Sequence, residues 1–145
     1  IVIMHSYSDP KLPHARPKEI EDSKLISRVV EFLKRQTDYA LSCGISESKI
    51  ILDPGMGGFI SSNPLSSWLI LEELPYIIEQ LQPFPVYLGV SRKAFLKKKG
   101  EKQIAERDEL ASEISAKAIA QGAKYIRTHN PASLIKAITS SVSEH

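Results

Sequence analysis

Short apolar runs alternate with longer amphipathic segments along the whole chain, and this alternation constrains the fold more than any other feature. Runs of strand length occupy residues 1–4, 49–53, 86–90 and 124–128. Apolar residues recur at helical spacing over residues 19–42, 65–80, 108–121 and 131–141. Strands separated by helices pair in parallel through right-handed crossovers. The pattern predicts four strands and four helices, half of an eightfold (β/α) barrel, with a doubly wound open sheet as the alternative.

Three of the four predicted strands run directly into polar side chains. Asp53 ends the second strand, Ser91-Arg92-Lys93 follows the third, and Arg127-Thr128-His129 follows the fourth. In a (β/α) barrel the carboxyl ends of the strands lie at one face, where the ligand binds. We therefore expect these groups to converge on one site.

The side chains at these strand ends suit an anionic or electron-rich ligand. Asp53 offers two acceptor oxygens to a ligand edge with adjacent N–H donors, although it could equally cap the turn that Pro54 and Gly55 form. Lys93 lies between an apolar strand and the apolar residues 94–96, so it could be partly desolvated and contact a ligand carbonyl or ring nitrogen. Its alternative is an ordinary surface cation.

Arg127 and His129 alternate on the predicted fourth strand and would therefore share one face. A guanidinium beside an imidazole is a reasonable clamp for a diphosphate. The alternative for His129 is a hydrogen bond to a backbone carbonyl at the rim. His5, after the first strand, is a weaker candidate, and the histidines are too scattered to predict a metal cluster.

Composition excludes several other classes of protein. The chain of 145 residues has a net charge of +2, which does not indicate a nucleic-acid surface. No apolar run reaches the roughly 18 residues of a membrane span, and no signal peptide is visible, so we expect no membrane partner and a cytoplasmic location. Cys43 and Trp68 are expected to pack in the interior. Because Ile1 already lies within a strand-like run, we expect a single-domain fragment, residues 1–145, that lacks an N-terminal half.

Four segments, taken in order, resemble the dihydropteroate synthase family. They are Met4-His5, residues 51–57 (Ile-Leu-Asp-Pro-Gly-Met-Gly), residues 89–96 (Gly-Val-Ser-Arg-Lys-Ala-Phe-Leu) and residues 126–129 (Ile-Arg-Thr-His). The resemblance covers essentially the whole chain but only the C-terminal half of the family's (β/α)₈ TIM barrel, about strands 5–8. It implies an enzyme that joins 6-hydroxymethyl-7,8-dihydropterin diphosphate to 4-aminobenzoate in folate biosynthesis and releases pyrophosphate.

The resemblance also implies a role for each matching residue. Asp53 would bind the amino and ring N–H edge of the pterin, and Lys93 would contact the pterin beside the 4-aminobenzoate pocket. Arg127 and His129 would hold the diphosphate. Further substrate-binding positions are Met4, Gly57, Phe59, Ser91, near the 4-aminobenzoate carboxylate, and Arg92, which would support the site.

The chain departs from the family pattern in the loop after Gly57. Gly58 stands where the family commonly has an aromatic residue, and Ile60 or Ser61 replaces the usual lysine. Either the loop shifts by one residue so that Phe59 fills the aromatic role, or the 4-aminobenzoate wall is altered. Asn130 also replaces a common acidic residue.

The family's first four strands would supply the Mg²⁺-linked asparagine and further pterin-binding groups, so we expect this fragment alone to be inactive. The family suggests a homodimer formed through its late helices. Two alternative functions stay open: a pterin-dependent methyltransferase, which would not require Ser91-Arg92-Lys93, and a non-catalytic pterin-binding homologue. The sequence leaves open a fused pyrophosphokinase domain and the sensitivity to sulfonamides.

Overall fold

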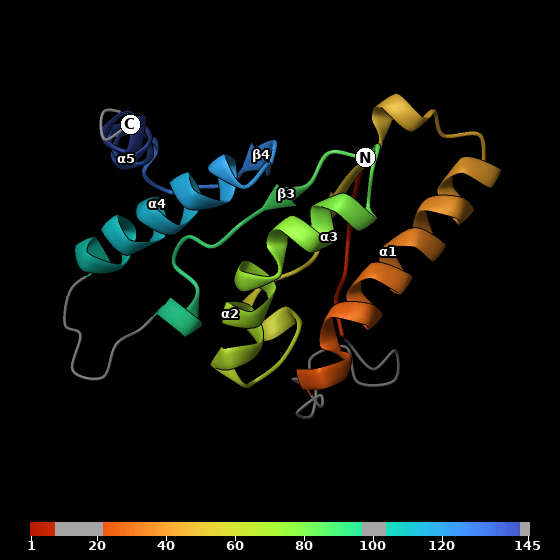
Figure 1. Cartoon of the computed structure of the whole chain (residues 1–145), viewed down its shortest axis with the longest axis horizontal. Helices are drawn as coiled ribbons and strands as arrows, with labels where there is room; N and C mark the ends of the chain where they lie inside the picture. Colours follow the sequence, from red (N-terminus) through yellow and green to blue (C-terminus); the bar gives the residue numbers. More distant parts are fainter. Residues whose placement is uncertain (8–21, 97–103, 143–145) are drawn as a thin grey trace.

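The computed structural model describes residues 1–7, 22–96 and 104–142, in which four short strands alternate with five α-helices (Figure 1). The strands are β1 (Val2–Met4), β2 (Ile51–Asp53), β3 (Tyr87–Leu88) and β4 (Tyr125–Ile126). The helices are α1 (Leu25–Ser42), α2 (Pro64–Glu72), α3 (Leu74–Gln80), α4 (Ile104–Ala120) and α5 (Pro131–Val142). The predicted alternation of strands and helices is therefore confirmed.

All four strands run parallel and follow one another in chain order. Met4 of β1 pairs with Asp53 of β2, and Tyr87 of β3 pairs with Tyr125 of β4. An isolated parallel bridge between Leu52 and Val86 connects the two pairs. This consecutive parallel order is the one that a (β/α) barrel uses.

The two faces of this strand layer differ sharply in burial. Leu52, Val86 and Leu88 are at most 1% exposed and face the helices. Successive side chains on a strand point to opposite faces, so Met4 and Tyr125 lie on the other face, where they are 38% and 47% exposed. The apolar core of the described residues therefore lies between strands and helices. The second face, called the open face below, carries the exposed Met4 and Tyr125 beside the buried Asp53.

Helix α1 buries a different stripe from the one expected. Val29, Val30 and Leu33 are buried as predicted, but Tyr39 is 67% exposed and Leu41 is 37% exposed. Thr37 and Ala40 continue the buried stripe instead, so the predicted face is wrong in the last turns. The expectation of a packed thiol is also wrong, because Cys43 follows the end of α1 and is exposed.

The segment predicted as one helix over residues 65–80 is two helices. Helix α2 ends at Glu72 and α3 begins at Leu74, with Pro75 in its first turn. Proline lacks the N–H that a continuous helix needs and fits best near a helix start. Trp68 of α2 was expected in the core but is 39% exposed, with its ring edge-on to Phe95.

Helices α4 and α5 lie together at the C-terminal side of the chain (Figure 1). Helix α4 begins at Ile104, earlier than expected, and also packs against β4. Asn130 caps α5 as predicted, because its Oδ1 accepts the N–H of Ser133 at 3.1 Å. Within the described parts of the chain, no helix combines the length and apolarity that crossing a membrane requires.

Candidate functional site

Asp53 lies at the carboxyl end of β2 and is only 6% exposed. The backbone N–H of Gly55 donates to its Oδ1 at 2.8 Å, so Asp53 does cap the following turn. Gly55 has φ of 78°, and a Cβ there would collide with the carbonyl oxygen of His5. Burial raises the pKa of the Asp53 carboxyl, while the Gly55 hydrogen bond and the charge of Lys93 lower it. A buried carboxylate is thus held at the strand end.

Lys93 extends from the end of the third strand segment toward the loop after β2. Its Nζ donates to the carbonyl oxygen of Met56 at 2.9 Å. Burial lowers the pKa of Lys93; the nearby charge of Asp53 raises it and that of Arg127 lowers it. The expected partial desolvation of Lys93 is therefore confirmed. Lys93 is close enough to Asp53 and to Arg127 for both charges to act on it.

The loop after β2 is shaped around the Lys93 side chain. The Lys93 ammonium lies 4.8 Å from the centroid of the Phe59 ring, which is half-exposed. A Cβ at Gly57 would lie 3.1 Å from Cδ of Lys93, and Gly57 has φ of 65°. Glycine therefore permits both the backbone turn and the close approach of Lys93. The N–H of Gly57 donates to Oγ of buried Ser67 at 2.9 Å, which ties the loop to α2.

Arg127 follows β4 and lies close enough to Lys93 and Tyr87 for its charge to act on both. Strand β4 ends at Ile126, so the prediction that Arg127 and His129 lie on the fourth strand is wrong. Strand alternation therefore does not place their side chains. The N–H of Arg127 still donates to the carbonyl oxygen of Leu88 at 2.9 Å, which keeps its backbone beside β3. A Cβ at Gly89 would lie 3.7 Å from Cβ of Arg127, so the two backbones run close together there.

Tyr87 is a candidate site residue that the sequence analysis missed. Its register partner is Tyr125, and its hydroxyl would lie 3.8 Å from a Cβ at Gly89, so the ring leans along β3 toward its carboxyl end. Burial and the charge of Asp53 raise the pKa of the Tyr87 hydroxyl, and Arg127 lowers it. Its place near the carboxyl end of the third strand, where the other candidates lie, was the signal that could have found it.

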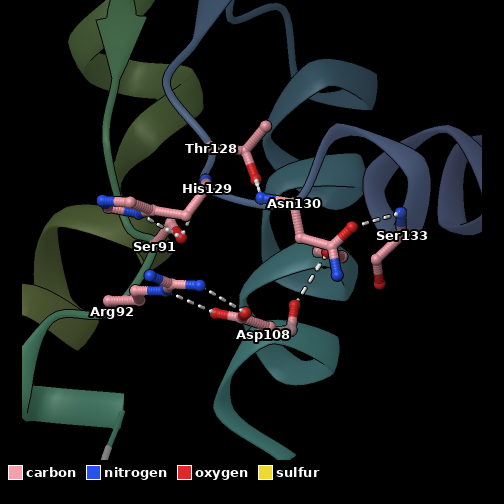
Figure 2. A network of polar contacts seen from close by, with 8 residues as sticks. Ser91, Arg92, Asp108, Thr128, His129, Asn130 and Ser133 are labelled. Carbon is pink, nitrogen blue, oxygen red and sulfur yellow. Dashed lines mark hydrogen bonds and ion pairs between the residues drawn. The ribbon is translucent and has the colours of Figure 1, made fainter. Parts of the chain in front are cut away.

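Ser91 and His129 bring the ends of β3 and β4 together. Oγ of Ser91 lies 2.9 Å from Nδ1 of His129 and also accepts the His129 backbone N–H at 3.3 Å. Figure 2 shows this contact beside the start of α5, where the Asn130 N–H donates to Oγ1 of Thr128 at 3.0 Å. The His129 ring therefore contacts the hydroxyl of Ser91, and not the backbone carbonyl that the sequence analysis gave as its alternative partner.

Arg92 points toward Asp108 of α4 (Figure 2). Its guanidinium forms two hydrogen bonds to the carboxylate of Asp108, which the sequence analysis did not single out as a site residue. The structure therefore ties Arg92 to α4, where it can support the turn between Ser91 and Lys93.

The end of β1 contributes one residue to each side of the strand layer. Met4 lies opposite Asp53 on the open face. His5 is buried against the ring of Phe32, and its Nδ1 lies 3.2 Å from the carbonyl oxygen of Pro54. Burial lowers the pKa of His5. His5 therefore packs beneath the loop that follows Asp53.

The site offers anion-binding cations and one carboxylate, but no metal-ligating cluster. Among residues 1–7, 22–96 and 104–142, no three His, Cys, Asp or Glu side chains could hold an ion together. Asp53 is the carboxylate of this site and feels the charge of Lys93. One carboxylate beside a cation does not fit Mg²⁺ by itself. The arrangement instead suits a ligand that has an N–H edge and a separate anionic group.

Parallel strands whose carboxyl ends carry this set of groups define part of a (β/α) barrel with a ligand site at that face. Residues 1–129 match the family model of the pterin binding enzymes. The chain belongs to this family.

Relatives in the family show how much of the barrel is present. A dihydropteroate synthase type-3 of Escherichia coli is 36% identical over 140 residues, covering 95% of this chain and 51% of that protein. A type-1 enzyme of Pseudomonas aeruginosa is 32% identical over 143 residues, covering 96% and 49%. The chain thus spans about half the length of the curated relatives it matches.

Solved structures show the same coverage of about half of the related chain. A dihydropteroate synthase of Anaplasma phagocytophilum with bound 6-hydroxymethylpterin-monophosphate aligns with a TM-score of 0.84 and 25% identity, over 99% of this chain and 54% of that one. The Xanthomonas albilineans enzyme with 4-aminobenzoic acid aligns with a TM-score of 0.81 and 26% identity, over 99% and 48%. The chain therefore has the fold of a partial TIM barrel, and the open-sheet alternative is excluded.

Proposed function

We propose that these residues form the C-terminal half of a dihydropteroate synthase, which condenses 6-hydroxymethyl-7,8-dihydropterin diphosphate with 4-aminobenzoate. The convergence of Asp53, Lys93 and Arg127 at the carboxyl ends of three strands carries this proposal. The charges of Asp53 and Arg127 both act on Lys93 although the three residues are far apart in sequence. Relatives named dihydropteroate synthase support it.

Asp53 and Lys93 would recognise the pterin ring. The carboxylate of Asp53 can accept hydrogen bonds from the amino group and the adjacent ring N–H. Lys93, whose ammonium now bonds the Met56 carbonyl oxygen, can offer a donor to a ring nitrogen or carbonyl. Met4 lies across from Asp53 on the open face and would contact the ring's apolar surface.

Arg127 and His129 would bind the diphosphate and stabilise it as it leaves. The amine nitrogen of 4-aminobenzoate attacks the pterin methylene carbon, the C–O bond to diphosphate breaks, and the nitrogen then loses a proton. Negative charge grows on the departing oxygen, and a fixed guanidinium stabilises it. Because Nδ1 of His129 contacts Ser91, its Nε2 can face a phosphate oxygen. A neutral amine attacks, so no protein nucleophile is required.

Phe59, Gly57 and Ser91 would border the 4-aminobenzoate. The contact between the Phe59 ring and Lys93 supports the interpretation in which Phe59 takes the aromatic position displaced by Gly58. Gly57 leaves the room that Lys93 occupies beside that ring. The Ser91 hydroxyl would lie near the carboxylate of the bound acid.

Two further parts of this proposal rest on the resemblance, and a third, the compartment, rests on the sequence. Mg²⁺ would be bound by residues of the family's N-terminal half, and no step described above passes through it. A homodimer would form through the late helices, which correspond here to α4 and α5. The cytoplasm stays the expected compartment.

Isothermal titration of 6-hydroxymethyl-7,8-dihydropterin diphosphate into the chain tests the proposal, with folding checked by circular dichroism. Saturable binding to the wild type and its loss in Asp53→Asn are expected. Asp38→Asn is the matched control, because it removes the same charge from an exposed position on α1.

The complete gene product serves as the second sample in this titration. A folded complete protein that binds no pterin diphosphate would refute the proposal. If instead the complete protein binds and the 145-residue chain does not, groups of the other half of the barrel are required for affinity. Equal binding by Asp53→Asn and wild type would remove Asp53 from the site.

A further inference from the structure

Arg92 has a backbone conformation that calls for a physical cause. Its φ is 58°, in the left-handed region, and it is the one non-glycine residue with positive φ in the described parts of the chain. Long side chains seldom adopt this conformation without support from their surroundings. The strain lies between Ser91, which contacts His129, and Lys93, which contacts Met56.

Asp108 supplies that support from α4. Nε of Arg92 donates to Oδ1 of Asp108 at 3.3 Å, and Nη2 donates to Oδ2 at 3.2 Å (Figure 2). The side chain of Asp108 is only 10% exposed, whereas that of Arg92 is 46% exposed. Two parallel bonds fix the orientation of a guanidinium more firmly than one bond does. A nearly buried carboxylate, in turn, requires a partner.

The ion pair connects a rigid helix to the peptide that carries Lys93. Helix α4 packs against β4 and α5, so Asp108 has a fixed place in the helical layer. The Lys93 N–H donates to the carbonyl oxygen of Val90 at 3.3 Å, which closes a tight turn around Arg92. Fixing the Arg92 side chain thereby limits the directions that the next side chain can take.

We propose that Asp108 is a positioning residue that, through Arg92, holds Lys93 toward the pterin site. The inference rests on the proposed function for its ligand. It adds a residue from α4 that touches neither the open face nor the substrate. Asp108 acts by fixing the turn of Ser91-Arg92-Lys93, so its effect on ligand affinity passes through Lys93.

Hydrogen exchange measures the turn independently of any ligand. In Asp108→Asn, we expect amides of residues 91–96 to exchange at least tenfold faster, with residues 25–42 unchanged. Glu109→Gln is the matched control, because it removes the same charge from the neighbouring exposed position on α4. Unchanged exchange at residues 91–96 in Asp108→Asn would overturn the proposal.

A double-mutant cycle on the complete gene product tests whether the effect passes through Lys93. Titrating 6-hydroxymethyl-7,8-dihydropterin diphosphate, we expect about tenfold weaker binding in Asp108→Asn, recovery in Asp108→Glu, and no further loss when Asp108→Asn is added to Lys93→Met. Additive losses would overturn the proposal. If the wild type itself does not bind, the proposed function fails, while the exchange measurement still decides whether Asp108 fixes the turn.

Discussion

The ammonium of Lys93 lies 4.8 Å from the centroid of the Phe59 ring while it donates to the carbonyl oxygen of Met56. The ring face carries partial negative charge and stabilises the charged amine. Lys93 is thus held between an aromatic face and a backbone acceptor, although burial lowers its pKa.

Replacing Phe59 with leucine should lower the pKa of Lys93 further. Leucine keeps an apolar side chain but removes the ring that favours the ammonium form. Titrating the Lys93 side chain by NMR against pH measures the shift. The control is Phe84→Leu, because Phe84 is a half-buried ring on the opposite side of the strand layer, beside Leu52. An unchanged Lys93 pKa in Phe59→Leu would show that the ring contributes nothing to holding the charge.

Gly57→Ala should destabilise the protein by about 1–2 kcal/mol, the usual cost of a side chain in the left-handed region. The added Cβ would also lie 3.1 Å from Cδ of Lys93. Gly58→Ala is the neighbouring control, because its Cβ would meet no atom within 4 Å. Urea unfolding of both variants measures the difference. Equal losses of unfolding free energy in Gly57→Ala and Gly58→Ala would mean that the backbone at residue 57 adapts to a side chain without extra cost.

Asp53→Asn should leave the free energy of unfolding unchanged or higher at pH 7. Burial raises the folded-state pKa of Asp53 above its unfolded-state pKa of about 3.9. The free energy of unfolding therefore falls as pH rises from the unfolded-state pKa through the folded-state pKa, because ionisation is less favourable in the folded protein. Asparagine removes this penalty and can still accept the Gly55 N–H. Urea unfolding at several pH values should show the two proteins converging below pH 4. A lower free energy of unfolding for Asp53→Asn than for the wild type at pH 7 would contradict this prediction.

Ser91→Ala should cost about 0.5–1.5 kcal/mol, the usual range for a lost hydrogen bond. The hydroxyl joins the ends of β3 and β4 through two contacts with His129. Ser112→Ala is the control, since that hydroxyl only bonds a carbonyl oxygen one turn back on its own helix. Thermal unfolding compares the two. A larger loss in Ser112→Ala would show that the contact between strand ends is not the stabilising one.

The alternation of apolar runs determined the strands, the parallel order and the strand ends that carry the site. The spacing of apolar residues shows which side chains share one face of a helix or strand, and such a face is normally the one that is buried in the core. It misjudged Tyr39, Leu41 and Trp68, because helical spacing does not say where neighbouring elements stop covering a helix. Pro75 is the sequence signal for the break before α3.

The ends of the predicted strands made Asp53, Lys93, Arg127 and His129 candidates, and the resemblance to the family gave each of them a role. Only the tertiary structure decided where each side chain points. Arg92 turned toward Asp108, sixteen positions further along the chain, because a left-handed backbone and a nearly buried carboxylate on α4 meet there. Contacts of this kind depend on how helices pack on strands, and local sequence patterns do not encode that geometry.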